Sequence, residues 1–230
     1  MQIPTELGVL DGLAALSLSR NHLTGTIPSE IVSLPRLREL WLYSNRLTGS
    51  IPSEIQNAKG LRSLLAHTNF LSRRLPTEIG LLQSLTDLNL SFNKFSRFLP
   101  SELGRLKELK HLTLSKNVFS GSIPSEIGSL ENLETMILSE NSLYGAIPSS
   151  VGMLSNLVEL RISRAGVGGF LPTEIGLMSG LEILELAQGR FQGTIPTEIG
   201  KLSLLGTFGI LRVFLCLPHS VLLMLFLFPL

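Results

Sequence analysis

The stretch Leu109–Gly128, LKHLTLSKNVFSGSIPSEIG, contains the pattern that decides the fold. Three leucines, Leu109, Leu112 and Leu114, lead to Asn117 in the order L-x-x-L-x-L-x-x-N, and an apolar residue follows two positions later. Successive side chains of a strand point to opposite faces, so the last two leucines face a core and the residue between them faces outward. The stretch therefore predicts a short strand that ends in a tight turn.

The Ile/Leu-Pro pair of this stretch recurs every 24 residues along the chain. It occurs nine times without insertion or deletion, beginning at Ile3, Ile27, Ile51, Leu75, Leu99, Ile123, Ile147, Leu171 and Ile195. A fixed period of this size indicates a repeat architecture, in which each unit buries its apolar face only against its neighbours. The period predicts a partial repeat over 1–12, eight full repeats over 13–204, and a degenerate ninth repeat with a hydrophobic tail over 205–230.

Each recurring position of the repeat has a physical reason. The Asn side chain can bond backbone groups that the turn leaves unpaired, and stacked Asn residues form a ladder. We expect the ladder to fray where Ala165 and Gly189 take the place of Asn. The Gly before Ile-Pro permits a tight backbone, although Arg73 and Arg97 replace it in the third and fourth repeats. The Ser/Thr-Glu after Pro suits a helix start, in which the hydroxyl caps a short helical turn.

Composition excludes several classes of function. The formal net charge is +1, from 19 Lys and Arg against 18 Asp and Glu, which argues against a nucleic-acid binder because such proteins need a basic surface. The single cysteine, Cys216, forms no internal disulfide and is expected to be a small buried apolar residue. His22, His67, His111 and His219 show no metal-ligand spacing. The sequence predicts no cofactor and no metal site.

The stretch Leu109–Gly128 closely resembles the plant-type leucine-rich repeat, L-x-x-L-x-L-x-x-N-x-L-x-G-x-I-P-x-x-[IL]-G. That class occurs in plant receptor-like kinases, receptor-like proteins and polygalacturonase-inhibiting proteins, and the resemblance covers residues 1–204. It implies an α/β solenoid, a right-handed superhelix with a parallel sheet on the concave side and short helical or 3-10 turns on the convex side. It also implies ligand or protein binding as the activity. No kinase motif is present, so the resemblance carries no kinase activity to this chain.

One group of residues stands out among those that the repeat places on the concave surface. We name it the concave patch: Glu39, Trp41, Tyr43, Leu65 and His67. Trp41 is the only Trp in the chain, and adjacent exposed aromatic side chains are typical anchors of interfaces. The alternative interpretation is that they pack only on neighbouring strands. We favour binding, because the repeat places both aromatic residues outside the core.

Enzymatic chemistry finds little support in the sequence. Acidic residues such as Glu159 and Glu185 gather on the same face with Arg161 among them, and a glycosidase would need two carboxylates. They lie on an open sheet with no predicted pocket, so a solvated surface of mixed charge is the better interpretation. The sequon Asn89-Leu90-Ser91 is uninformative, because one such match is expected by chance. The sequence predicts that the chain is not an enzyme.

The tail that follows Leu204 departs from the repeat and leaves three interpretations open. Leu205, Phe208 and Ile210 keep the spacing of a ninth strand, and no charge occurs from Val213 to Leu230. The uncharged run is a membrane anchor, the disordered apolar end of a degenerate terminal coil, or a mispredicted or frameshifted end of the gene model. We favour the anchor, because 18 helical residues span roughly 27 Å. The chain also starts within a repeat and without a signal peptide, so we expect a fragment of a membrane or cell-surface protein.

These observations lead to a hypothesis about function. We expect a non-enzymatic recognition scaffold that presents the concave patch to a protein or peptide ligand, as part of a receptor-like protein. The alternative is a structural spacer with no ligand of its own.

Overall fold

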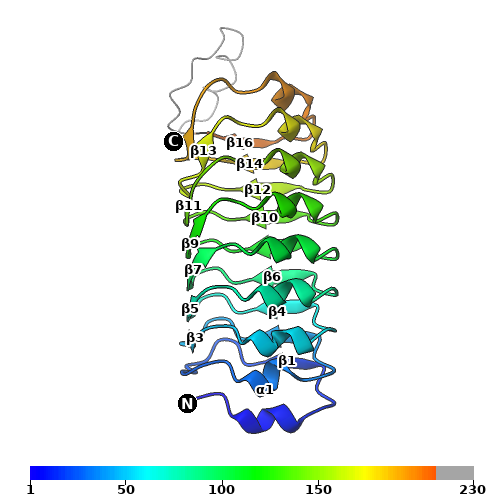
Figure 1. Ribbon diagram of the computed structural model, residues 1–230, viewed down its shortest axis with the longest axis vertical. Helices are drawn as coiled ribbons and strands as arrows, with labels where there is room; N and C mark the ends of the chain where they lie inside the picture. Colours follow the sequence, from blue (N-terminus) through cyan, green and yellow to red (C-terminus); the bar gives the residue numbers. More distant parts are fainter. Residues whose placement is uncertain (211–230) are drawn as a thin grey trace.

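One three-residue strand from each coil joins a nine-stranded parallel sheet that runs along the molecule (Figure 1). Its strands are β1 (Ala15–Ser17), β2 (Glu39–Trp41), β4 (Ser63–Leu65), β6 (Asp87–Asn89), β8 (His111–Thr113), β10 (Thr135–Ile137), β12 (Glu159–Arg161), β14 (Ile183–Glu185) and β16 (Thr207–Gly209). Leu40 pairs with Leu16 on one side and with Leu64 on the other, so the register advances by one repeat per strand. The computed structural model describes residues 1–210, and it confirms one concave strand per coil, including the ninth.

A second parallel sheet lies beside the first, and the sequence did not reveal it. It contains β3 (Thr48–Gly49), β5 (Phe70–Arg73), β7 (Lys94–Phe98), β9 (Val118–Gly121) and β11 (Ser142–Leu143), while β13 (Gly168–Gly169) and β15 (Arg190–Phe191) form a separate pair. Its strands follow the Asn of each coil. We call this surface the side sheet.

Short helical turns cover the side of the coils opposite the nine-stranded sheet (Figure 1). They are η1 (Thr5–Val9), α1 (Ser29–Val32), η2 (Ser53–Asn57), η3 (Thr77–Leu81), η4 (Ser101–Arg105), η5 (Ser125–Ser129), η6 (Ser149–Met153), η7 (Thr173–Leu177) and η8 (Thr197–Lys201). The expected hydroxyl cap is wrong, because Pro takes the cap position and no side chain bonds there. The hydroxyl donates instead to the following carboxylate, as Ser125 Oγ does to Glu126 Oε2 at 3.2 Å.

The Asn ladder links each coil to its neighbours inside the turn. Asn93 Nδ2 donates to Ala66 O at 2.9 Å in the preceding coil and to Leu90 O at 3.1 Å in its own. Its Oδ1 accepts a bond from Leu71 N at 2.9 Å. The ladder ends at Asn141, since Ala165 follows it one coil later.

The side sheet divides at the same place, because β11 and β13 do not pair. The ladder and the side sheet thus stop together between the sixth and seventh coils. The end of the ladder is the one expected from the loss of Asn in the last two repeats, whereas the division of the side sheet was not expected.

Arg73 and Arg97 occupy the glycine position and keep its backbone conformation. Both have φ of 70°, close to the 81° of Gly121 in the next coil. A residue with a Cβ pays roughly 1–2 kcal/mol for this left-handed geometry. The stack of coils therefore dictates the backbone even where the sequence disfavours it.

The predicted membrane anchor and Cys216 lie outside the described residues. Within residues 1–210, the structure contains no helix with the length and apolar character needed to cross a membrane.

Candidate ligand-binding face

The concave patch occupies two neighbouring strands of the nine-stranded sheet. Trp41 and Leu65 are paired in the register of β2 and β4, and Glu39 is paired with Ser63. All five side chains of the patch are half-buried, so each presents part of its surface to solvent. The structure thus brings together the residues that the sequence singled out.

Two rings of the patch form a stack across the coils. The ring centroids of Tyr43 and His67 lie 4.7 Å apart, and their planes differ by 8°. The Arg20 guanidinium lies 6.0 Å from the Tyr43 centroid on the preceding coil, within the range of a cation–π contact. Burial lowers the pKa of His67, which favours the neutral form of its ring.

Sequence reasoning missed Arg20. It occupies the position after the outward-facing strand residues, where the chain already turns away from the sheet. The sequence did show that Arg20 lies one coil before Tyr43. Whether its long side chain reaches the Tyr43 ring depends on its rotamers, which the sequence does not give.

A hydrogen bond to the next coil fixes the polar edge of Trp41. Its Nε1 donates to Ser63 Oγ at 3.2 Å. A satisfied indole N–H leaves the apolar surface of the ring for contact with a ligand.

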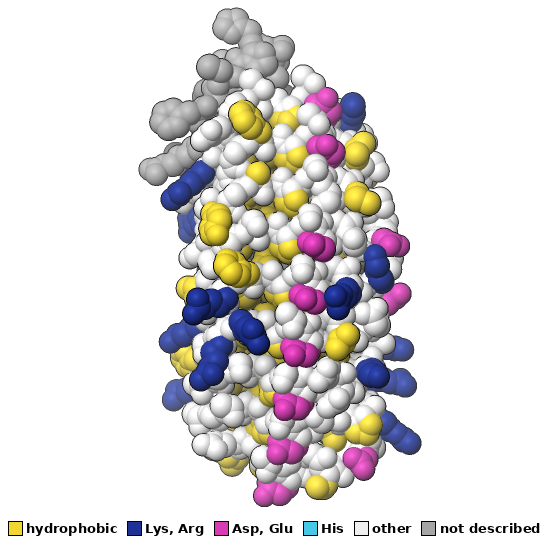
Figure 2. All heavy atoms as spheres, in the orientation of Figure 1, with side chains coloured by type: hydrophobic (Ala, Val, Ile, Leu, Met, Phe, Trp, Pro, Cys, Tyr) yellow, Lys and Arg dark blue, Asp and Glu magenta, His cyan; other side chains and the backbone are white. Residues whose placement is uncertain are grey.

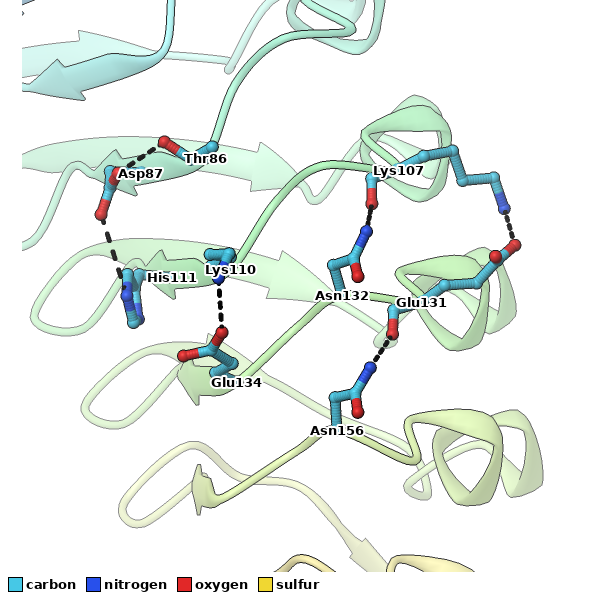
Figure 3. A network of polar contacts seen from close by, with 9 residues as sticks. All are labelled: Thr86, Asp87, Lys107, Lys110, His111, Glu131, Asn132, Glu134 and Asn156. Atoms are coloured by element: carbon cyan, nitrogen blue, oxygen red, sulfur yellow. Dashed lines mark hydrogen bonds and ion pairs between the residues drawn. The ribbon is translucent and has the colours of Figure 1, made fainter.

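The middle of the sheet carries polar links between coils (Figure 3). Lys110 Nζ lies 2.9 Å from Glu134 Oε1, and His111 Nε2 lies 4.0 Å from Asp87 Oδ1. The hydrogen bond raises the pKa of Lys110 and lowers that of Glu134. Both groups therefore stay charged near neutral pH, which suits a structural link between coils rather than proton transfer.

The carboxylates considered for glycosidase chemistry are held by one guanidinium. Arg161 contacts Glu159 on its own strand, and its Nη1 lies 2.6 Å from Glu185 Oε2 on the next. These two carboxylates raise the pKa of Arg161 further, through hydrogen bonds and charge. The three residues form a half-exposed surface of mixed charge, in agreement with the expectation from sequence.

Other candidate features of the face add no chemistry to it. Asn89 lies on β6, where its Oδ1 accepts bonds from Ser91 N at 3.1 Å and Ser91 Oγ at 2.7 Å. Residues 1–210 contain no group of three His, Cys, Asp or Glu arranged to hold a metal ion. Two shallow depressions, of about 540 and 510 Å³, include no residue of the concave patch.

Comparisons with known protein families identify the repeat. The model of the leucine-rich repeat region matches residues 100–211, and the single leucine-rich repeat model matches residues 12–34, 36–58 and 84–106. No curated protein matches the chain.

Solved structures with the same fold include ectodomains of plant receptors. One is the ectodomain of the membrane receptor kinase GASSHO1/SCHENGEN3 from Arabidopsis thaliana in complex with CASPARIAN STRIP INTEGRITY FACTOR 2. It has 32% identity and a TM-score of 0.90, over 94% of this chain and 29% of that chain. Another is the Arabidopsis receptor kinase HAESA in complex with the peptide hormone IDA and the co-receptor SERK1. It has 36% identity and a TM-score of 0.85, over 96% of this chain and 37% of that chain.

The match to the receptors is partial in length. This chain spans about a third of either receptor structure. A plant ice-binding protein is also similar, at 29% identity and a TM-score of 0.69, over 87% of this chain and 73% of that one.

Proposed function

The chain belongs to the leucine-rich repeat proteins, and on that premise we propose that its concave sheet recognises a peptide or protein ligand through the concave patch. The HAESA structure that the chain resembles holds a peptide hormone, which supports a ligand of this class. We propose a place at the cell surface for the same reason, since these neighbours are ectodomains of membrane receptors. The observation that carries the proposal is the half-exposed pair Trp41 and Tyr43 on an otherwise mostly polar sheet.

The arrangement of the patch suits an interface anchor. Aromatic side chains and arginines are enriched where interfaces are most fully desolvated. The stack of Tyr43 on His67 holds both rings in place, so little side-chain freedom is lost when a ligand covers them. Glu39 on the same strand offers a carboxylate to a cationic or N–H group of the ligand.

The similarity to the ice-binding protein does not favour a second function. Ice presents a regular lattice, and a matching surface needs the same small polar group in every coil. The position after the glycine, which is Thr26 in the first coil, is instead occupied by Arg74, Phe98 and Phe170 in later coils.

A peptide library displayed on phage and selected on the immobilised full chain tests the proposal. Peptides that bind are synthesised, and their affinities for the chain and for a Trp41→Ala/Tyr43→Ala variant are measured by calorimetry. Loss of two anchors is expected to weaken binding by roughly thirtyfold or more, with the unfolding midpoint little changed.

The matched control is Thr113→Ala/Ser115→Ala, which alters the same two positions in the fifth coil. This variant is expected to bind the selected peptides as the unaltered chain does. Equal affinity of the Trp41→Ala/Tyr43→Ala variant and the unaltered chain removes the concave patch as the site. If no library yields a peptide that binds, the result favours the alternative that the chain is a structural spacer with no ligand of its own.

A further inference from the structure

The nearly neutral chain separates its charges onto different surfaces. In each coil a nine-residue segment, such as 68–76 or 92–100, runs from the end of the concave strand to Pro and contains the side sheet. Together the eight segments carry nine Lys and Arg residues and one acid, Glu140. The rest of the chain carries ten Lys and Arg residues against 17 Asp and Glu. We call the cations of these segments the basic strip.

The basic strip is exposed and almost unpaired. Arg73, Arg74, Lys94 and Arg97 are all exposed and concentrate in the third and fourth coils. Among residues 1–210, Lys116 is the only cation of the strip in an ion pair, with Glu140 at 3.6 Å. Arg73 and Arg97 hold their charge at a strained position where six other coils have Gly. Uncompensated charge at a strained position favours a partner that supplies the opposite sign.

The opposite sign occurs on the convex turns of the same molecule. A Glu follows Pro-Ser/Thr in eight of the nine turns, and Ser150 takes its place in the sixth coil. These carboxylates form a single line along the long axis, with Lys and Arg side chains gathered beside it (Figure 2). We call the line the acidic column.

We propose that the basic strip of one copy docks on the acidic column of a second copy, with the two solenoids side by side, parallel and in register. Both surfaces repeat once per coil, so a contact made in one coil recurs in the others at the same spacing of roughly 4.8 Å. This interface lies on other surfaces than the concave patch and meets it only at Arg20, whose guanidinium also lies over Tyr43.

The sixth coil favours the parallel, in-register arrangement. It is the one full coil whose strip residue is acidic, Glu140, and it is also the one whose column residue is uncharged, Ser150. In register, Glu140 meets Ser150 and no like charges oppose each other. Each of the other seven full coils offers a cation to a Glu, as Arg20 does to Glu30 in the first coil. A shift by one coil sets Glu140 against the carboxylate of Glu126 or Glu174.

The size and charge of the surfaces fit a reversible contact. Eight coils at roughly 4.8 Å extend about 40 Å, which is enough for an interface of ordinary size. A net charge of +1 produces little overall repulsion between copies. The exposed Phe70 and Phe98, which belong to the same segments as the basic strip, add apolar contact area. Since the two surfaces differ, the contact is heterologous, and each added copy leaves a free strip and a free column unless the rotation between copies closes a ring.

Sedimentation velocity of the full chain, in a non-ionic detergent that keeps its apolar tail dispersed, tests the proposal. Association is expected to increase from about 10 µM to about 1 mM protein. It is expected to weaken at least tenfold when NaCl rises from about 50 to about 500 mM. Arg73→Glu/Arg74→Glu/Arg97→Glu is expected to lower the association constant at least tenfold. The control Arg36→Glu/Lys59→Glu/Arg62→Glu makes the same change of charge outside the strip and is expected to associate normally.

Mixing two variants separates this arrangement from other partners. Glu78→Arg/Glu102→Arg/Glu126→Arg removes the column and is expected to abolish association alone, but to pair with the strip variant, since that variant retains an intact column. A monomer at the highest concentration, or association that the column variant leaves unchanged, overturns the proposal. Binding of polyglutamate or of a polyuronate by a chain that stays monomeric assigns the strip to a different acidic partner and equally overturns it.

Discussion

At the scale of single residues, the structure shows side-chain contacts between coils that the repeat pattern does not predict. Alternation along the strand was enough to place Trp41 and Tyr43 on the outer face. It could not show that Tyr43 stacks on His67 or that Arg20 approaches from another coil, because those contacts depend on rotamers. The glycine that recurs in the convex helical turns is a similar case, because a close contact with the next coil is what requires it.

Gly128 illustrates that reason and gives a prediction. A Cβ built at Gly128 would lie 2.2 Å from the backbone oxygen of Ser150 in the next coil. Because a backbone atom blocks the space, Gly128→Ala must push two coils apart and is expected to destabilise the chain by roughly 1–3 kcal/mol. Urea unfolding followed by circular dichroism measures the change.

Gly12→Ala is the matched control, since nothing lies within 4 Å of a Cβ at Gly12. This variant is expected to be neutral or slightly stabilised, because it reduces the freedom of the unfolded chain. Equal effects of the two substitutions on stability would show that contact between coils is not the reason why glycine is required in the turn.

At the scale of elements, the sequence predicts the parts that bury leucines and misses the parts that do not. The L-x-L pattern located every concave strand, because alternation into a core leaves a clear signal. The side sheet escaped because strands as short as Thr48–Gly49 have almost no period to detect. The capping prediction failed because it assigned the cap to the residue after Pro, whereas the backbone places Pro itself there.

The Asn ladder is an element whose contribution can be measured. Asn93 is buried, and Asn93→Ala removes the partner of Leu71 N and one of the two bonds to Ala66 O, which still accepts from Asn69 Nδ2. A buried unsatisfied donor costs about 1–3 kcal/mol, so we expect a loss of roughly 1–3 kcal/mol in the free energy of unfolding.

Asn21→Ala serves as the comparison for the ladder. The exposed Asn21 bonds only carbonyls of its own coil, Leu18 O and Ser19 O. We expect a loss below about 1 kcal/mol in the same urea titration. A loss at Asn93 no larger than that at Asn21 would mean that links between coils contribute little.

At the scale of the whole molecule, the stack is a one-dimensional array in which each coil is stabilised by its two neighbours. The fixed period was therefore sufficient to predict the architecture over residues 13–204. The same logic makes stability uneven along the chain. The ladder and the continuous side sheet both end after the sixth coil, so the seventh and eighth coils are expected to open before those in the middle.

Hydrogen exchange on the full chain checks this order of opening, and Ala165→Asn is the variant that should change it. Asn141 donates to Leu114 O and Leu138 O and accepts from Phe119 N. The same offsets from residue 165 lead to Leu138 O, Ile162 O and Leu143 N, so an Asn there would extend the ladder by one coil. Amides of β12 and β14 are expected to exchange at least tenfold more slowly in the variant, since about 1.4 kcal/mol of added stability corresponds to that factor.

The control for the extended ladder is Ala146→Asn, which adds the same amide at an exposed position and is expected to leave the exchange rates unchanged. If Ala165→Asn slows exchange no more than Ala146→Asn does, the ladder is not what holds the central coils together. The early opening of the last two coils must then come from the division of the side sheet between β11 and β13. Because the two substitutions differ only in where the amide lies, the comparison separates the contribution of the Asn from that of the strands beside it.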